Sequence, residues 1–441
     1  MIDRHVLLQV IEDQKTLSLR PSSPLFLREA MKEVEKNLNN PFVVVLSGIR
    51  RSGKSTLLQQ IRQQSQEFDF FINLDDERLS TFSMEHFQML LELWIELFGV
   101  QKTCYFDEIQ NIGGWEKFIR RLSDQGYKIF ITGSNATLLS QELGTRLTGR
   151  FIQVEVMPYS FQEIIQNEAP NLVNKDSKNM RNTEDRAFIK QKFFEFYQTG
   201  GFPEYRLYGS LEYLQTLYQS ILYRDILVRY KLRDSEKVLR ELGLYLASNF
   251  SKELSFNSLK NTLGVGNPTT VKEYCHYLEN SYLCFLINRF DYSLKKQTLF
   301  SKKQYFIDLA LARSVSFRAS EDHGRALENI VFLELHRRYG KEVYFHSQTK
   351  ECDFILRQGI DITQALQVCV NLNNPETKTR EISGLIEALS TYGLSHGLIL
   401  TEDTYGQEII KNEDDSKVFT IDILPIWDWL LRNKTEKFSD K

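Results

Sequence analysis

The sequence predicts an α/β protein, and three observations carry this prediction. Residues 42–46 form an unbroken apolar run, Phe-Val-Val-Val-Leu, which is typical of a strand buried on both faces. Residues 48–55 form a glycine-containing loop directly after that run. Leu57, Leu58 and Ile61 then follow at helical spacing, which predicts a helix after the loop. Strand, tight loop and helix therefore follow one another as in an α/β unit.

The loop reads G-I-R-R-S-G-K-S, two glycines with four residues between them, followed by Lys and Ser. Gly48 and Gly53 allow backbone N–H groups to turn inward around an anion, and the following helix N-terminus adds partial positive charge. Lys54 is expected to reach the β- and γ-phosphates of ATP, and Ser55 to ligate Mg²⁺. The residues expected to bind the nucleotide are Gly48, Ile49, Arg50, Arg51, Ser52, Gly53, Lys54, Ser55 and Thr56. The alternative is an ordinary glycine-rich turn that happens to contain Lys-Ser.

Length and composition set the wider limits. A chain of 441 residues is long for one core, so we expect about three domains. A net charge of −3 provides no global basic field, so any DNA contact must be a local patch. The five cysteines include no C-x-x-C pair, which favours reduced thiols and a cytoplasmic protein. We expect no signal peptide and no membrane span.

A second apolar strand, within residues 103–108, ends in two carboxylates. In P-loop enzymes the first, here Asp107, orients Mg²⁺, and the second, here Glu108, polarises the attacking water. The alternative is a strand that ends in a solvated Asp-Glu turn.

A third strand, residues 128–132, ends in Gly-Ser-Asn. Its polar tip is expected beside the γ-phosphate, because ligands of such sheets bind at the strand C-termini. Ser134 and Asn135 are therefore candidate γ-phosphate sensors, and a helix cap is the alternative for Asn135. Arg146 and Arg150 precede the next apolar strand and are candidate arginines acting in trans in a homo-oligomer. A surface salt bridge is the alternative for them.

These motifs together resemble a family of prokaryotic AAA+-type ATPases fused to a C-terminal region of unknown function. The segments that carry the resemblance are residues 73–79, 107–111, 114–116, 132–134, 149–151, 158–161, 200–204 and 223–227. The likeness covers nearly the full chain from about residue 25. It implies a P-loop ATPase core in residues 1–157 and a helical lid in residues 158–235. In related ATPases a glycine-proline turn closes that lid on the adenine, which gives Pro203 this expected role.

Residues 236–315 have the order of a helix-turn-helix followed by a β-wing. A short helix over 255–260, a turn over 264–268 and a second helix capped by Thr269-Thr270 precede a strand over 283–287. The expected wing is basic, with Lys295, Lys296, Lys302 and Lys303. Two interpretations stay open for this winged helix: binding of double-stranded DNA, or docking of a protein.

Residues 316–441 resemble a restriction-endonuclease-like α/β domain. Glu328 near the start of a helix and Asp353 in a strand have the spacing of its metal-binding acids. The expected acid-x-Lys pair is replaced by Gln367 and Cys369, and a thiol cannot supply the charge of a lysine. The sequence therefore predicts a degenerate fold used for protein interaction, without nuclease activity.

The favoured function is an ATP-binding protein and Mg²⁺-dependent ATP hydrolase whose nucleotide state, ATP or ADP, controls the lid and the C-terminal domains. Two alternatives remain from the sequence. One is a DNA-binding regulator that holds ATP without significant turnover. The other is a nuclease licensed by nucleotide.

Overall fold

The computed structural model describes residues 2–18, 26–134, 149–173, 182–316, 322–411 and 417–432. The chain divides into two compact units. Unit 1 consists of Met1–Tyr159 together with Phe202–Glu204 and Asn280–Tyr282. Unit 2 consists of Ser160–Gly201, Tyr205–Glu279 and Leu283–Lys441.

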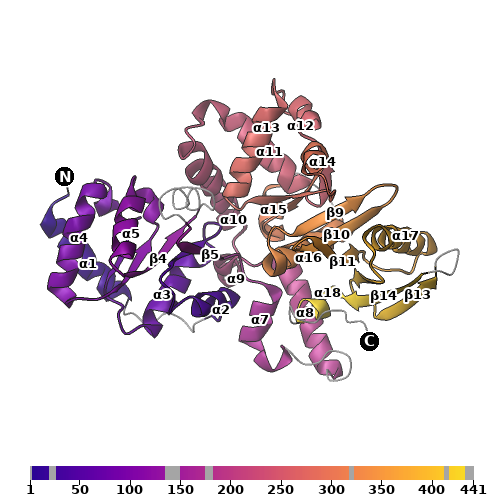
Figure 1. Ribbon diagram of the computed structural model, residues 1–441, viewed down its shortest axis with the longest axis horizontal. Helices are drawn as coiled ribbons and strands as arrows, with labels where there is room; N and C mark the ends of the chain where they lie inside the picture. Colours follow the sequence, from indigo (N-terminus) through magenta and orange to yellow (C-terminus); the bar gives the residue numbers. More distant parts are fainter. Residues whose placement is uncertain are drawn as a thin grey trace. The chain divides into compact units, whose positions relative to one another are not determined.

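Unit 1 contains a parallel sheet of five strands in the order β2-β3-β4-β1-β5. Figure 1 labels β4 and β5 of this sheet. The strands are β1 (Val43–Ser47), β2 (Phe71–Asn73), β3 (Thr103–Asp107), β4 (Lys128–Gly133) and β5 (Phe151–Glu155). The helices are α1 (Arg4–Ser18), α2 (Glu29–Lys36), α3 (Lys54–Gln64), α4 (Phe87–Phe98) and α5 (Trp115–Asp124). The predicted α/β class and the three predicted strands are confirmed, with strand ends within one residue of the prediction.

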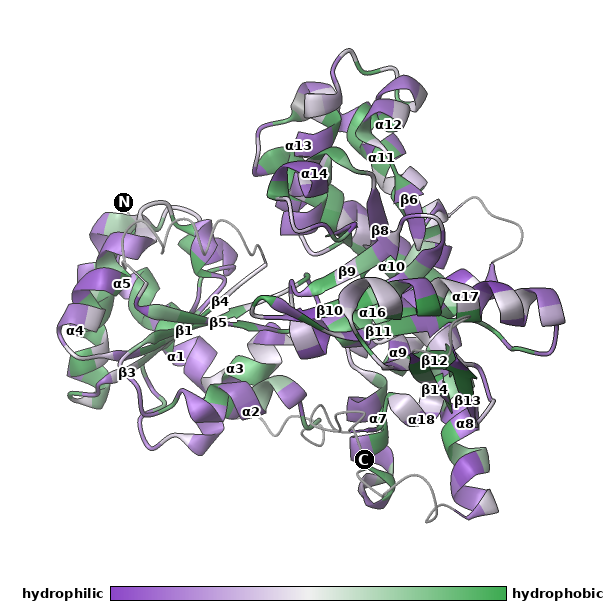
Figure 2. Ribbon diagram, turned by 45° about the vertical axis from the view of Figure 1, so that its right-hand side comes forward, coloured by the Kyte–Doolittle hydropathy of each residue, from purple (hydrophilic) through white to green (hydrophobic). Residues whose placement is uncertain are grey.

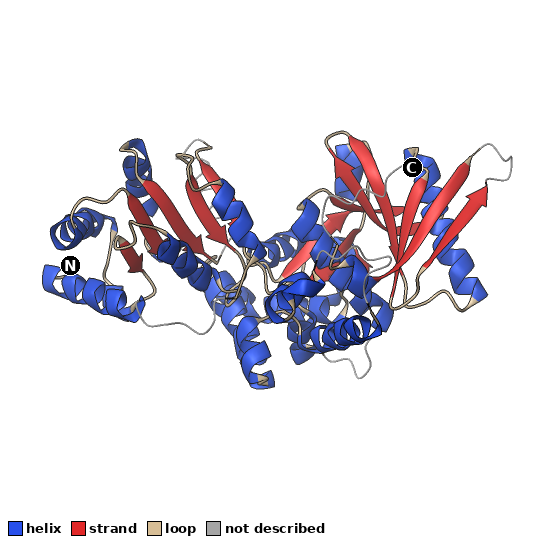
Figure 3. Cartoon of the chain, turned by 90° about the horizontal axis from the view of Figure 1, so that it is seen from below, coloured by secondary structure: helices blue, strands red, loops and turns tan. Residues whose placement is uncertain are grey.

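The sheet of unit 1 is covered on both faces. Alternate residues of β1 enter different cores: Val43 and Val45 pack with α1, α4 and α5, and Val44 and Leu46 pack with α2 and α3. Figure 3 shows these strands with helices on either side, and Figure 2 shows β1 and β3 as largely hydrophobic. Burial on both faces explains why this strand is a continuous apolar run in the sequence.

Unit 2 contains two sheets. An antiparallel sheet of three strands has the order β6-β8-β7, and a mixed sheet of six strands has the order β13-β14-β12-β11-β10-β9. The strands are β6 (Lys252–Leu254), β7 (Cys284–Asn288), β8 (Lys302–Phe306), β9 (Val343–Ser347), β10 (Glu351–Gln358), β11 (Asp361–Val368), β12 (His396–Thr401), β13 (Gly406–Lys411) and β14 (Val418–Pro425). In the mixed sheet, β12 pairs in parallel with β11 and β14, and the other pairs are antiparallel.

Helices surround both sheets of unit 2 (Figure 1). They are α7 (Phe161–Glu168), α8 (Thr183–Thr199), α10 (Leu211–Ser220), the π-helix Ile221–Val228, α11 (Glu236–Ser248), α12 (Phe256–Thr262), α13 (Pro268–Asn280), α14 (Leu294–Leu299), α15 (Leu309–Val315), α16 (His323–Tyr339), α17 (Pro375–Tyr392) and α18 (Ile426–Trp429). Helix α9 (Pro203–Tyr208) begins in unit 1 and continues in unit 2. No helix within the described ranges combines the length and the apolar character needed to cross a bilayer.

Two details of the predicted winged helix are wrong. Lys302 and Lys303 do not belong to an exposed wing, because both lie in strand β8 and are buried. The second helix begins at Pro268, and Asn267, not Thr269 or Thr270, caps it: its Oδ1 accepts from the N–H of Thr269 at 2.8 Å. Lys295 and Lys296 are exposed as expected. The winged helix itself stays a prediction.

Candidate functional site

The loop between β1 and α3 requires glycine at two positions. Gly48 has a φ of +153°, and a Cβ at this position would overlap the carbonyl oxygen of Val156 in the chain after β5. Gly53 has a φ of +96° and is the N-cap residue of α3. The loop is therefore held against the end of β5, with the N-terminus of α3 at its other side.

Arg28, which the sequence analysis did not select, braces this loop. Its guanidinium is buried and donates to the carbonyl oxygens of Ser52, at 2.8 Å, and Met157, at 2.6 Å. One side chain thus joins the loop to the segment that follows β5. Arg28 precedes α2 and belongs to no recognisable motif, so only the fold reveals its position.

Lys54 is buried in the first turn of α3. Its ammonium donates to the carbonyl oxygens of Gly48, at 3.1 Å, and Ile49, at 3.0 Å. The positive charge is therefore directed back over the loop, on the side where backbone N–H groups and the helix N-terminus would meet an anion. Ser52 is fully buried, and its Oγ has no hydrogen-bond partner within the described residues.

Asp107, at the end of β3, meets two hydroxyl groups. Its Oδ1 accepts from Ser55 Oγ at 3.0 Å and from Thr132 Oγ1 at 2.5 Å. The parallel arrangement brings the ends of β3 and β4 to the same sheet edge as the loop. Burial, together with the neighbouring Glu108, raises the pKa of Asp107 to about 6.

Glu108 has a positive φ of 53°, unusual for a residue with a side chain. Its N–H donates to Thr132 Oγ1 at 2.9 Å, and its carboxylate accepts from the amide of Gln110. Thr132 therefore contacts both acidic residues. The sequence analysis selected Ser134 and not Thr132 as a site residue, although Thr132 is the last residue of the predicted strand and is polar.

The other residues predicted for the site differ in burial and in their partners. Ser134 is buried at the end of β4, whereas Asn135 and Arg146 lie outside the described residues. Arg150 is exposed and pairs with Asp124 at 3.0 Å. Arg51 has a φ of 66° and pairs with Glu204 at 3.0 Å, one residue after Pro203 at the start of α9. The structure therefore brings Gly48, Gly53, Lys54, Ser55, Asp107 and Glu108 to one edge of the sheet, together with Thr132.

These residues fit a nucleoside triphosphate with Mg²⁺. A helix N-terminus, an inward-facing ammonium and the buried hydroxyl of Ser52, which has no hydrogen-bond partner among the described residues, suit an anion. The oxygens of Ser55 and Asp107 are hard donors of the type that Mg²⁺ prefers.

Comparison with known proteins supports this class. Residues 40–165 match the family described as "AAA domain", and residues 190–322 match the family described as "Domain of unknown function (DUF8612)". The fold and the loop thus define a P-loop protein with an AAA domain, which implies binding and hydrolysis of ATP and typically binding of Mg²⁺.

Two relatives extend the match to almost the whole chain. An uncharacterized protein of Methanocaldococcus jannaschii is 34% identical over 449 residues, covering 98% of this chain and 96% of that protein. An uncharacterized protein of Haemophilus influenzae is 30% identical over 409 residues, covering 89% and 94%. The chain therefore belongs to a family of prokaryotic proteins that join an AAA domain to this domain of unknown function. The resemblance seen in the sequence is confirmed.

Solved structures add little to this assignment. A STAND signal-transduction ATPase with a tetratricopeptide repeat sensor from Pyrococcus horikoshii is 15% identical, with a TM-score of 0.26. The match covers 72% of this chain and 46% of that chain. Caenorhabditis elegans PCH-2 is 14% identical, with a TM-score of 0.27 over 45% of this chain and 58% of that chain. The restriction-endonuclease-like type of the C-terminal mixed sheet stays a prediction.

Proposed function

We propose that the protein is a Mg²⁺-dependent ATP hydrolase in which Lys54, Ser55, Asp107 and Glu108 perform the roles expected from the sequence. The observation that supports this proposal best is the contact of Ser55 Oγ with Asp107 Oδ1 at 3.0 Å, one residue beyond Lys54. The phosphate-binding lysine and the serine of the proposed metal-binding pair are then adjacent in the first turn of α3, and the carboxylate of the pair comes from the end of β3. When bound, ATP would supply the γ-phosphoryl group, and Mg²⁺ would supply positive charge between the phosphates and these residues.

Each residue has a distinct task in this proposal. Lys54 neutralises charge on the β- and γ-phosphates, and Ser55 with Asp107 holds Mg²⁺. Glu108 orients water, and Thr132 positions Glu108 by accepting its backbone N–H. Ser134 at the end of β4 is the described candidate for sensing the γ-phosphate.

Nucleotide state is proposed to reach the rest of the chain through residues 202–204. Arg51 of the phosphate loop pairs with Glu204, next to Pro203, the residue proposed to stack on adenine. Both side chains of that pair are about half exposed, so the pair itself contributes little stability and is easily rearranged. A sharp switch between two arrangements needs ~5 kcal/mol of differential affinity, which Mg²⁺ and the γ-phosphate would supply.

Steady-state ATP turnover of the full-length protein tests the assignment. Lys54→Ala and Glu108→Gln should each lower the turnover number by about 100-fold or more, because each removes charge or proton transfer needed in the transition state. Matched controls are Lys117→Ala and Glu85→Gln, which change exposed residues of unit 1 that belong neither to the phosphate loop nor to the ends of β3 and β4. Full turnover in Lys54→Ala would refute the assignment. Tight ATP binding without turnover in the wild type would instead support a binding switch.

A trans-acting arginine is proposed at Arg150, which is exposed and held only by the surface partner Asp124 within the described contacts. If it completes a site in a second copy, an Arg150→Ala protein mixed with a Lys54→Ala protein should recover turnover. An unchanged rate in Arg150→Ala alone would exclude that role.

A further inference from the structure

The segment Asn280–Tyr282 ends α13 and leads to β7, and it belongs to unit 1 although the residues on both sides of it belong to unit 2. Its residues carry polar groups, yet they are only 6%, 1% and 4% exposed. Segments that connect a helix with a strand usually run over the surface, where water satisfies their polar groups. This segment, which we call the Tyr282 turn, must therefore find its hydrogen-bond partners within the protein.

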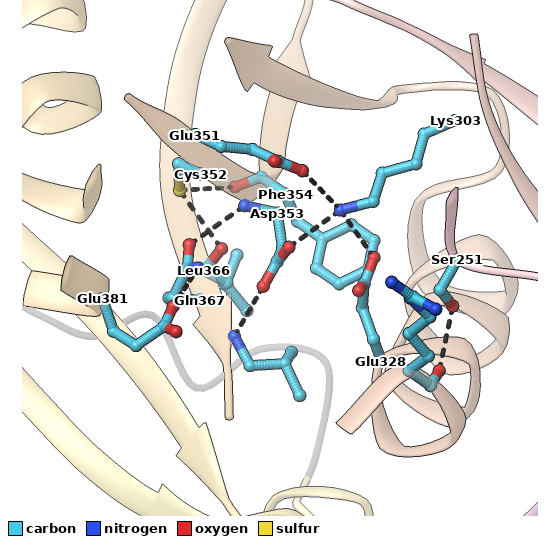
Figure 4. Close-up of polar contacts among 12 residues, drawn as sticks. Ser251, Lys303, Glu328, Glu351, Cys352, Asp353, Phe354, Leu366, Gln367 and Glu381 are labelled. Carbon is cyan, nitrogen blue, oxygen red and sulfur yellow. Dashed lines mark hydrogen bonds and ion pairs between the residues drawn. The ribbon is translucent and has the colours of Figure 1, made fainter. Parts of the chain in front are cut away.

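A second buried polar group shows the more usual arrangement. In unit 2 the ammonium of Lys303 lies 2.8 Å from carboxylate oxygens of both Glu328 and Asp353. It also lies 2.9 Å from a carboxylate oxygen of Glu351 (Figure 4). All four residues belong to unit 2, so these charges are neutralised within one unit. The Tyr282 turn differs, because its neighbours in the chain belong to unit 2 and its partners belong to unit 1.

The hydroxyl of Tyr282 belongs to a triangle of hydrogen bonds within unit 1. It donates to Ser47 Oγ at 2.8 Å. The side-chain amide of Gln153 donates to the same Oγ at 2.7 Å and to the Tyr282 hydroxyl at 3.1 Å. Ser47 is the last residue of β1, and Gln153 lies on the neighbouring strand β5. The turn is therefore bonded to two adjacent strands of the sheet.

Ser47 connects this triangle with the phosphate loop. It is fully buried and directly precedes Gly48, whose carbonyl oxygen accepts from the ammonium of Lys54 at 3.1 Å. The carbonyl oxygen of Ser47 accepts from the N–H of Val156 at 2.7 Å. The main chain of Ser47 is thus held by the segment after β5, and its side chain by Tyr282 and Gln153. Tyr282 acts on the start of the loop through this one residue.

The backbone of Tyr282 is strained. Its φ is +61°, in the left-handed region that is unfavourable for a residue with a side chain. Such strain persists only where the surrounding contacts impose it. Burial raises the pKa of the Tyr282 phenol above its ordinary value, so the hydroxyl stays protonated and can donate. The conformation of the turn therefore depends on its hydrogen bonds, and their loss would allow the turn to relax.

The ends of the turn are fixed within unit 2. The N–H of Leu283 donates to the carbonyl oxygen of Leu278 on α13 at 3.0 Å. Glu279 Oε1 on α13 accepts from the N–H of Leu286 on β7 at 2.9 Å. Because few residues separate these anchors, a change in the turn must also alter the last turn of α13 or the start of β7.

We propose that Tyr282 is a positioning residue for the phosphate loop, and that the order of the Tyr282 turn and the binding of nucleotide at the loop depend on each other. This inference rests on the proposed function, because it requires a loop that binds nucleotide. Coupling between two sites is reciprocal. A turn that favours the binding conformation of the loop is therefore stabilised by the same factor when nucleotide binds. Nucleotide would in this way strengthen the structure of α13 and β7.

Calorimetric titration of the full-length protein with ADP tests the effect on the loop. Tyr282→Phe keeps the ring and removes the hydroxyl, and it should weaken ADP binding about fivefold or more. Turnover at saturating ATP should stay within about twofold of the wild type, because Tyr282 acts through Ser47 and not on the phosphoryl group. The matched control is Tyr274→Phe, which removes a hydroxyl that donates to Ser235 Oγ at 2.6 Å from α13 itself, and it should leave ADP affinity unchanged.

Two further variants test the route through Ser47. In a Ser47→Ala background, Tyr282→Phe should cause little additional loss of ADP affinity, because its partner is already gone. Gln153→Ala changes an exposed residue of β5 and removes the other partner of the same hydroxyl. It should weaken ADP binding in the same direction, which keeps the proposal testable if Tyr282→Phe does not fold. Independent, additive losses from Ser47→Ala and Tyr282→Phe would overturn the route.

Hydrogen–deuterium exchange of peptides that cover residues 268–288, with and without saturating ADP, tests the reciprocal effect. ADP should slow exchange there in the wild type and in Tyr274→Phe, and the slowing should be at least fivefold smaller in Tyr282→Phe. Wild-type ADP affinity and wild-type slowing in Tyr282→Phe would overturn this inference alone and leave the proposed function intact. A wild-type protein that binds neither ATP nor ADP would overturn both.

Discussion

The hydroxyl of Ser55 lies 3.0 Å from Oδ1 of Asp107, across 52 residues of sequence. The same oxygen accepts a hydrogen bond from Thr132 Oγ1, so this buried carboxylate is held by two hydroxyl groups. Loss of water outweighs these hydrogen bonds, which is why the pKa of Asp107 is raised to about 6. Ionised Asp107 therefore lowers the stability of the protein without nucleotide, and a bound cation would relieve this loss of stability.

Replacing Asp107 with Asn should stabilise the nucleotide-free protein at pH 8. In the unfolded chain the carboxyl ionises near pH 3.8, whereas in the folded chain it ionises near pH 6, so ionisation opposes folding. The cost grows as pH rises between these values and is fully present above pH 6. A shift of about two pKa units corresponds to at most ~3 kcal/mol.

Melting temperatures of the two proteins, compared at each pH, measure this effect. Asp107→Asn should melt higher at pH 8, and its advantage should disappear below pH 4, where Asp107 is protonated in both states. An equal or lower melting temperature at pH 8 would contradict the prediction. ATP turnover should be lost in the same variant, since an amide binds Mg²⁺ weakly.

Gly48→Ala should destabilise the protein and abolish ATP binding. Its Cβ would overlap the carbonyl oxygen of Val156, which is backbone and cannot rotate away. We expect a loss of about 2–4 kcal/mol, within the range for severe steric substitutions. Gly99→Ala is the control, because Gly99 also has a positive φ but an added Cβ there would meet no atom within 4 Å. A Gly48→Ala protein with wild-type melting temperature and ATP affinity would show that the loop is not held against β5.

The sequence predicted correctly those parts of the site whose residues are adjacent in the chain. The phosphate loop, the end of β3 and the end of β4 each belong to a short apolar strand followed by polar residues, and each appears where predicted. Sequence could not identify Arg28 or Thr132, because their partners, such as Met157 and Asp107, are far along the chain.

The wrong prediction for Lys302 and Lys303 has the same cause, since their partners are also distant in sequence. Lys302 and Lys303 are charged residues in a five-residue stretch, Lys-Lys-Gln-Tyr-Phe, and composition alone favours an exposed loop. The stretch is instead a buried strand, because each ammonium finds oxygen partners: Lys302 bonds Asn288 and Gln297, and Lys303 bonds three carboxylates. Burial of a charge depends on partners that only the tertiary structure provides. If this region binds DNA, replacing Lys295 and Lys296 should therefore weaken the binding and make it less dependent on salt concentration.

Thr132→Val should reduce ATP turnover at least tenfold. The substitution keeps the shape of the side chain but removes the donor to Asp107 and the acceptor for the N–H of Glu108. Leaving such buried groups unpaired costs about 1–3 kcal/mol each. Thr132→Ser keeps the hydroxyl and should retain most turnover. If valine and serine variants were equally active, Thr132 would have no positioning role.

Gly200 and Asp308 should be energetically coupled. Gly200 has a φ of 64°, and a Cβ there would overlap the buried carboxylate of Asp308. That carboxylate accepts from the N–H groups of Gly201, at 2.7 Å, and Leu311, at 2.9 Å. It therefore holds the turn before α9 and caps α15 at the same time.

A double-mutant cycle measures this coupling through unfolding free energies. Gly200→Ala combines backbone strain with the clash, whereas Gly209→Ala, at a φ of 67° with open space, carries the strain alone. Gly200→Ala should therefore cost at least ~1 kcal/mol more than Gly209→Ala. Asp308→Ala removes two hydrogen bonds and also the clash, so the double variant should be more stable than the sum of the single losses by about 1–3 kcal/mol. Strictly additive losses would mean that the turn is held by other contacts, and that Gly200 is required only for its backbone conformation.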